Sequence, residues 1–212
     1  MKKTILFGLF GLLLGAATSC VDLDDNKDNN DYLIVEPDER VFVFDENGVP
    51  SHISAPTLSA AGQQTLYDEV VGYGWRRTFT CEINDDGTIK SEDYFYLLDG
   101  AGPITYYIKT AEELHRYFYV DAVPMNAYNI QPITIDAKTG TLYDANSTHF
   151  SLRIFAIGQH NDKWHIYAIE PLGLRSNGNS YKTVWGCTDL VRMTDEELKR
   201  KQDESQLLET DN

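Results

Sequence analysis

Alternation of apolar and polar residues dominates the middle of this chain and predicts β-strands. The clearest example covers residues 75–83, where every second position is occupied by Trp75, Arg77, Phe79, Cys81 and Ile83. Alternation of this kind places successive side chains on opposite faces of a strand. We therefore expect these five side chains on one face, followed by a hairpin turn at residues 84–87.

Shorter runs of β-branched and aromatic residues predict further strands on both sides of this one. They cover residues 41–44, 89–98, 104–109, 133–136, a stretch around 142, 150–158, 164–170 and 182–192. The segments between them are small and polar, or rich in proline, glycine and asparagine, and are predicted as loops, among them residues 51–61 and 172–180. Residues 121–149 are predicted as loops that enclose the two short strands at 133–136 and around 142. The chain is therefore expected to be mainly β.

Three segments carry helix signals. Residues 63–71 have apolar side chains at helical spacing before Gly72. Thr110 and Glu113 have the spacing of a capping box, which predicts a short inserted helix to about residue 119. The same spacing at Thr194 and Glu197 predicts a charged C-terminal helix and tail over residues 194–212.

The first residues have a different character from the rest of the chain. Lys2 and Lys3 precede an apolar run over residues 4–17, and small residues then lead to Cys20. A basic start, a short apolar segment and small residues are typical of a secretory signal. A transmembrane helix needs about 20 apolar residues, so residues 1–19 are predicted to be a signal peptide.

This signal resembles that of bacterial lipoproteins, in particular the relaxed form found in Bacteroidetes. The resemblance implies that Cys20 is the lipid-modified first residue and attaches the protein to a membrane. Ala17 stands where such signals usually have leucine, and the sequence before Cys20 also suits ordinary signal peptidase, which would release a soluble periplasmic protein.

Residues 20–40 are predicted to be an acidic spacer. Five aspartates and almost no apolar residues occupy positions 21–31, a composition that cannot form a packed core. Acidic residues directly after the lipid cysteine resemble the surface-export signal of Bacteroidetes lipoproteins. This implies an outer-membrane lipoprotein exposed on the cell surface, with the periplasmic face as the alternative.

Composition limits the function classes that remain. The formal net charge is −15, which argues against nucleic acid as a partner. The part between the spacer and the tail, residues 41–193, is long enough to form one domain with its own core. No phosphate-binding loop, dinucleotide motif or serine-nucleophile motif occurs, so we expect no catalytic residues and no enzymatic activity.

The cysteines and histidines indicate no metal site and no cofactor. With Cys20 lipidated, Cys81 and Cys187 remain, and they could form one disulfide or stay as two thiols. Neither cysteine belongs to a paired motif, and the five histidines fit no zinc spacing.

Gly74-Trp75 at the start of the first long strand and Asp86-Gly87 at its end resemble the opening of bacterial lipocalin-like domains. The resemblance implies a small antiparallel meander barrel over residues 63–193. In a closed meander the first and last strands pair antiparallel. Lipocalin-like domains have an arginine of the last strand near that tryptophan, which implies this structural role for Arg192.

A register that sets Cys81 opposite Cys187 makes this pairing specific. Phe79 then faces Asp189, Ile83 faces Trp185, and Trp75 faces Met193 with Arg192 alongside. Arg77 would share a face with Trp75 and Trp185, and as a buried charge it would need a partner, for which Asp189 is the candidate. The pair would be either structural or a guanidinium that binds an anionic or polar ligand.

Tyrosines suggest a second place for a ligand. Tyr94 and Tyr96 share a strand face, where they serve either as packing or as a platform for a sugar ring or a flat apolar ligand. We therefore expect a non-enzymatic cell-envelope lipoprotein that binds a small apolar or glycan ligand. One alternative is an assembly subunit that docks on an outer-membrane protein through residues 121–149. The other is a hydrolase with an unrecognised site.

Overall fold

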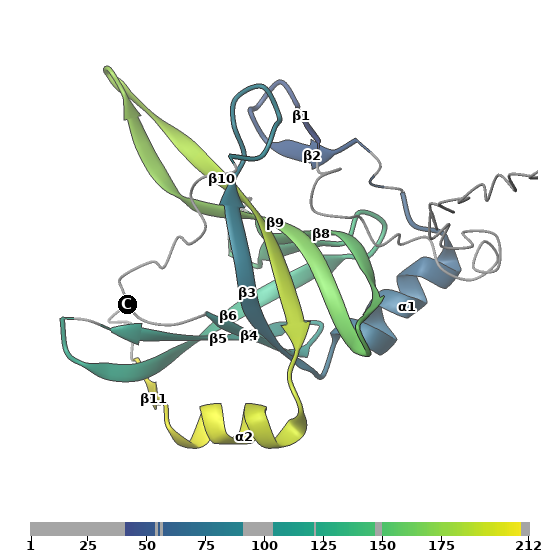
Figure 1. Cartoon of the computed structure of the whole chain (residues 1–212), viewed down its shortest axis with the longest axis vertical. Coiled ribbons are helices and arrows are strands. Elements are labelled where there is room, and N and C mark those ends of the chain that lie inside the picture. Colours follow the sequence, from purple (N-terminus) through teal and green to yellow (C-terminus); the bar gives the residue numbers. More distant parts are fainter. Residues whose placement is uncertain are drawn as a thin grey trace, which may run out of the picture.

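The computed structural model describes residues 41–53, 55, 57–90, 104–120, 122–146 and 150–208. Nine strands form one large sheet, antiparallel apart from its last short strand, in the order β11-β6-β5-β4-β3-β10-β9-β8-β7. β6 also pairs with β7, so eight of these strands form a near-closed ring (Figure 1). The bounds of the ring strands are β3 (Gly74–Glu82), β4 (Thr105–Thr110), β5 (Glu113–Val120), β6 (Met125–Asp136), β7 (Thr141–Asp144), β8 (Phe150–His160), β9 (Lys163–Asn177) and β10 (Ser180–Arg192).

The first and last long strands pair side by side, as expected. β3 and β10 are antiparallel, with Cys81 opposite Cys187 and Phe79 opposite Asp189. The register then shifts by one residue, because Thr78 is an extra residue in β3 and Arg77 lies opposite Leu190.

This β-bulge has two consequences for the predicted arrangement. Arg192 lies directly opposite Trp75, the place predicted for Met193. The single face predicted for the alternating side chains of β3 is also wrong, because the bulge reverses which side of the sheet they reach. Trp75 belongs to the core cluster inside the ring, whereas Ile83 belongs to a second cluster outside it, together with Cys187 and Trp185.

A small hairpin covers that outer cluster. It is formed by β1 (Phe42–Phe44) and β2 (Pro50–His52), and Phe42 packs edge-on against Phe155 of β8. The turn that follows β3 supports the hairpin, because the backbone amide of Phe42 donates to the carbonyl of Gly87. The strand predicted at residues 41–44 is therefore confirmed.

Two of the three predicted helices are present. α1 (Ala60–Val70) places Leu66 and Val70 in the interior core and packs across one end of the ring (Figure 1). α2 (Asp195–Asp203) has the predicted capping box, with both hydrogen bonds between Thr194 and Glu197 formed.

The helix predicted after Thr110 is wrong, because this segment is the turn and second strand of the β4–β5 hairpin. Thr110 accepts a hydrogen bond from the Glu112 amide, two residues on, which closes a tight turn. The residues that follow include buried Leu114, His115 and Tyr117, and the strand is rich in aromatic residues. Pairing with β4 and β6 on both edges outweighs the local capping signal.

Two regions predicted to be mainly loop contain more strand than expected. Residues 121–149 contain all of β6 and β7, so the strand predicted at 133–136 is the end of a longer one that begins at Met125. Residues 172–180 form the end of a long hairpin that projects from the ring (Figure 1). Of the strand predicted at residues 89–98, Ile89 forms a bridge to Ile83, and residues 91–98 lie outside the described residues.

The last described strand adds to the part of β6 that β7 leaves unpaired. After α2, β11 (Gln206–Leu207) pairs parallel with β6 at Ala127 and Tyr128. Leu198 of α2 packs so closely over Gly74 that a Cβ there would lie 2.8 Å from its Cδ1 atom. Neither helix in the described ranges is long and apolar enough to cross a membrane.

Candidate functional site

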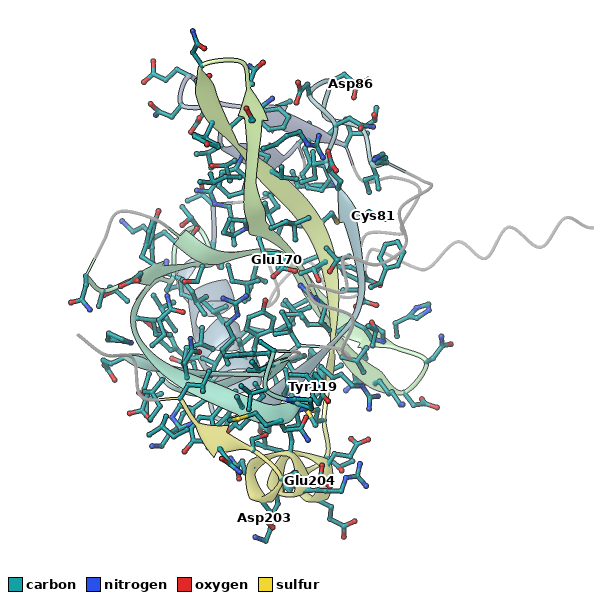
Figure 2. The ribbon with its side chains drawn as sticks, turned by 90° about the vertical axis from the view of Figure 1, so that its left-hand side faces the viewer. Cys81, Asp86, Tyr119, Glu170, Asp203 and Glu204 are labelled. Atoms are coloured by element: carbon teal, nitrogen blue, oxygen red, sulfur yellow. The ribbon has the colours of Figure 1, made fainter. Side chains whose placement is uncertain are left out.

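The interior of the ring has an apolar part and a polar part. The apolar part adjoins α1 and includes Leu66, Trp75, Ile108, Leu142, Ile154 and Leu190. Next to it, polar side chains from several strands meet around Glu170 of β9, which lies near mid-height of the molecule in Figure 2. Buried polar groups cost free energy unless they are hydrogen-bonded, so their partners decide what this region can do.

Arg77 and Glu170 form an ion pair at the centre of the polar part. Arg77 Nη1 lies 3.0 Å from Glu170 Oε1, and both side chains are at most 5% exposed. The expectation that Arg77 is buried with an acidic partner is confirmed, but Asp189 is the wrong partner. The bulge at Thr78 turns Arg77 to the inside, whereas Asp189 lies opposite Phe79 and binds His165 and Thr78.

Glu170 is saturated by further donors. The hydroxyl of Tyr106 donates to its Oε2 atom over 2.5 Å, and the hydroxyl of Thr80 lies 3.4 Å from Oε1. Burial, together with the adjacent Glu170 carboxylate, raises the pKa of Tyr106 well above its ordinary value. Tyr106 is therefore a permanent hydrogen-bond donor near neutral pH, and Glu170 has no need of a ligand.

A partly open cavity of about 130 Å³ adjoins this network. Its lining is mostly polar and comprises Tyr106, Leu114, Arg116, Gln131, Asp144, Ser151, Glu170 and Pro171. The cavity lies where the ring is least complete, because β6 pairs with β7 only over its last four residues. Beyond that point the side chain of Gln131 bridges from β6 to Ser151 of β8, with a hydrogen bond of 2.8 Å.

Arg116 is the unusual member of the lining. Its guanidinium carbon lies 5.9 Å from the centre of the Tyr106 ring. Among the described residues, its buried Nε atom has no hydrogen-bond partner. Asn129 lies directly opposite Arg116 on β6, and its buried Oδ1 atom also has no partner within the described part of the chain. A donor and an acceptor are thus both unsatisfied at neighbouring positions.

Sequence reasoning missed Arg116, Asn129, Tyr106 and Glu170 as a group. Arg116 interrupts an apolar alternation between Leu114 and Phe118, which would have marked an inward-facing arginine. That signal was lost because the segment was assigned to a helix.

Two residues predicted for ligand binding, Trp75 and Trp185, lie away from the cavity. Trp75 is fully buried, and its Nε1 donates to the carbonyl of Val70 over 3.1 Å. Trp185 faces outward, where its Nε1 donates to the carbonyl of Gly48 over 2.8 Å. Neither residue lines the cavity.

Arg192 lies beside Trp75, as predicted, and it also packs against two further aromatic rings. Its guanidinium carbon lies 3.8 Å from the ring centre of Tyr73, 5.2 Å from that of Trp75 and 5.1 Å from that of Trp164. Its Nη2 atom pairs with Glu69 over 3.0 Å. Its buried Nε atom also has no hydrogen-bond partner in the described ranges, but these rings and Glu69 occupy its surroundings.

The remaining predicted residues divide into two groups. Cys81 and Cys187 are both buried and lie directly opposite each other, the arrangement that a cross-strand disulfide requires. Cys20, Tyr94 and Tyr96 lie outside the described residues.

A second cavity, of about 170 Å³, lies beside the projecting hairpin, and charged pairs occupy its walls. Arg175 binds both carboxylate oxygens of Glu82, over 2.9 and 2.8 Å, and Lys182 pairs with Asp85. These pairs attach the hairpin to the end of β3, so we assign this cavity a structural role.

The site therefore consists of the cavity beside Arg116 and the hydrogen-bond network around Glu170. The described residues contain no group of three or more histidine, cysteine or acidic side chains that could hold a metal ion. In comparisons with known proteins, no protein-family model and no curated protein matches this chain.

Proposed function

We propose that this protein is a non-enzymatic binding protein of the cell envelope, which holds a small polar ligand in the cavity beside Arg116. We further propose that its strand ring is a small lipocalin-like barrel. The eight-stranded ring and the packing of Arg192 over Trp75 support this architecture.

The observation that carries the binding function is the buried Nε of Arg116. A buried donor without a partner costs about 1–3 kcal/mol, and more for a charged group. Arg77, in the same region, is paired with Glu170. A ligand that accepts a hydrogen bond from Arg116 would remove this cost, and the cavity provides room for one.

The polar lining favours a polar ligand over the apolar ligand expected from the sequence. Leucine, isoleucine and tryptophan side chains fill the apolar part of the ring. Because protein interiors are densely packed, that part supports a structural core and not a site for a lipophilic molecule.

A titration followed by NMR tests the proposal. Backbone amide shifts of the exported chain are recorded while small polar compounds are added, including sugars, amides and carboxylates. We expect shifts that saturate and concentrate at Leu114, Arg116 and Gln131. A library that leaves these amides unchanged would refute the binding function at this site.

Location in the envelope is a separate part of the proposal. The signal over residues 1–19, Cys20 and the acidic segment to residue 40 support a lipoprotein, displayed on the cell surface or on the periplasmic face of the outer membrane. Metabolic labelling with a radioactive fatty acid tests it. We expect incorporation that is lost in Cys20→Ala, and equal labelling of the variant would contradict lipidation at this residue.

A second candidate function is docking on an outer-membrane protein through the projecting β9–β10 hairpin. Leu174 and Tyr181 are 71% and 76% exposed, and the register places both on one face of the hairpin. Residues 121–149 support docking less well, since most of them belong to strands of the ring. Crosslinking in the native envelope, compared between the natural chain and Tyr181→Ser, tests this candidate.

A further inference from the structure

We infer that the cavity beside Arg116 binds a small carboxylic acid that carries a hydroxyl or amino group on the carbon next to the carboxylate. This inference rests on the proposed binding function and names its ligand class. Three features carry it: the size of the cavity, the charge of its wall, and the two unsatisfied polar atoms of Arg116 and Asn129.

The cavity size sets the size of the ligand. Its volume is about 130 Å³. An apolar cavity of about 150 Å³ in another protein holds one benzene molecule, and drug-sized sites begin near 300 Å³. The ligand therefore has about six non-hydrogen atoms, which excludes most lipids and complete sugar rings.

Arg116 favours an anionic group on the ligand, in a wall that also contains the carboxylates of Asp144 and Glu170. Arg116 is permanently protonated, and its guanidinium can present two parallel donors to a carboxylate. Glu170 cannot serve this purpose, because Arg77, Tyr106 and Thr80 already occupy its carboxylate. The wall thus contains a cation whose charge no carboxylate of the described residues balances within ion-pair distance.

The neighbouring acceptors select a donor beside the carboxylate. Asn129 lies opposite Arg116, and its buried Oδ1 lacks a donor within the described ranges. Asp144 is itself a lining residue, and its carboxylate would repel a second carboxylate and accept a hydroxyl or amino group. One carboxylate with one adjacent donor would satisfy Arg116 and Asp144 together, while Asn129 is the strand neighbour of Arg116 next to this lining.

Four probes of nearly equal size test this inference on the exported chain by calorimetry and NMR. Lactate and alanine carry the carboxylate and the adjacent donor, propionate lacks the donor, and lactamide lacks the negative charge. We expect lactate or alanine to bind at least tenfold more tightly than propionate and lactamide. Which of the two binds more tightly distinguishes a hydroxy acid from an amino acid.

Variants assign the interaction to named groups. Arg116→Gln should weaken the binding of the tighter of lactate and alanine by about 10- to 100-fold, the usual range for a hydrogen bond to a charged group. Arg116→Lys retains the charge without the paired donors, and should weaken the binding of the same probe less. Asn129→Ala should make the affinity for lactate or alanine approach that for propionate. Arg200→Gln, on the exposed face of α2, removes the same charge as a control and should change nothing.

The outcomes separate this inference from the proposed function. Equal affinity for lactate, alanine, propionate and lactamide, or binding that Arg116→Gln leaves unchanged, would overturn the ligand class. Saturable shifts at Gln131 with lactamide, and with none of the other three probes, would also overturn the ligand class. They would leave the proposed binding function in place. Absence of any shift at the lining residues with all four probes and with neutral sugars would reject both. Thermal unfolding of each variant confirms that it is folded.

Discussion

Arg192 lies directly opposite Trp75 across the β3–β10 strand pair, with its guanidinium carbon 5.2 Å from the centre of the tryptophan ring. The same guanidinium contacts the rings of Tyr73 and Trp164 and pairs with Glu69, at the end of α1. One side chain therefore connects the first strand of the ring, its last strand and the helix that packs across one end.

We expect Arg192→Met to destabilise the protein by about 2–3 kcal/mol. The variant loses cation–π contacts worth about 0.5–2 kcal/mol and an ion pair that is largely shielded from water. Urea denaturation measures the change. Arg200→Met on exposed α2 is the matched control and should lie within about 0.5 kcal/mol of the natural chain. Equal midpoints for both variants would contradict this structural role of Arg192.

The Arg77–Glu170 pair makes a sharper prediction. Glu170→Gln breaks a buried ion pair by removing one of its two charges, which costs about 3–5 kcal/mol. The double variant Arg77→Met/Glu170→Gln should recover part of this loss, because both charges of the pair are then removed. A double-mutant cycle by urea denaturation gives the coupling energy. Asp189→Asn is the control for the partner predicted from the sequence, and should show no coupling with Arg77→Met.

The raised pKa of Tyr106 leads us to expect that the protein loses stability in alkaline solution. Its pKa is raised in the folded protein, so the unfolded chain loses the phenol proton first as pH rises. Stability from this group is complete below pH 10 and declines above it, by at most about 1.4 kcal/mol per pH unit. Urea denaturation at pH 9, 10 and 11 should show a smaller decline in Tyr106→Phe than in the natural chain. Tyr181→Phe, at an exposed tyrosine, should leave the decline unchanged.

The contact between Gly87 and Phe42 leads us to expect that the β1–β2 hairpin depends on the turn after β3. Its φ is +84°, and a Cβ at this position would lie 1.8 Å from the carbonyl oxygen of Phe42. Gly87→Ala should therefore cost about 2–4 kcal/mol, because backbone strain adds to a clash with backbone that cannot move aside. Gly178→Ala, at a hairpin tip with φ +66° and open space, should cost only about 1 kcal/mol. Hydrogen exchange should show the Phe42 amide, which bonds to Gly87, losing protection only in the first variant.

Alternation in the sequence identified β3 and β10 as strands, because strand periodicity is local. Their pairing, and the place of Arg192 beside Trp75, were predicted from the resemblance to a closed meander together with a register assumed to set Cys81 opposite Cys187, and the strand pair has these neighbours. Residue chemistry also indicated that a buried Arg77 requires an acidic partner, since this follows from the cost of desolvating a charge.

The partner itself could not be predicted, because a bulge depends on the register of a whole strand pair. Thr78 has no local signal that distinguishes it from a regular strand residue, yet it decides that Arg77 meets Glu170. The false helix after Thr110 has a related cause. A capping signal involves four neighbouring residues, whereas the strand that replaces the helix depends on β6, about fifteen residues further along the chain.

The extra residue in β3 also prevents the two terminal strands from sliding past each other. In a regular strand pair, slippage by two residues would keep every side chain on its own face. Here it would move the bulge away from the position where Trp75 fits the interior and Ile83 fits beneath the small hairpin. A single threonine thus gives the closure of the ring a unique alignment, and a chain that lacked it would have to leave one of the two apolar clusters exposed to water.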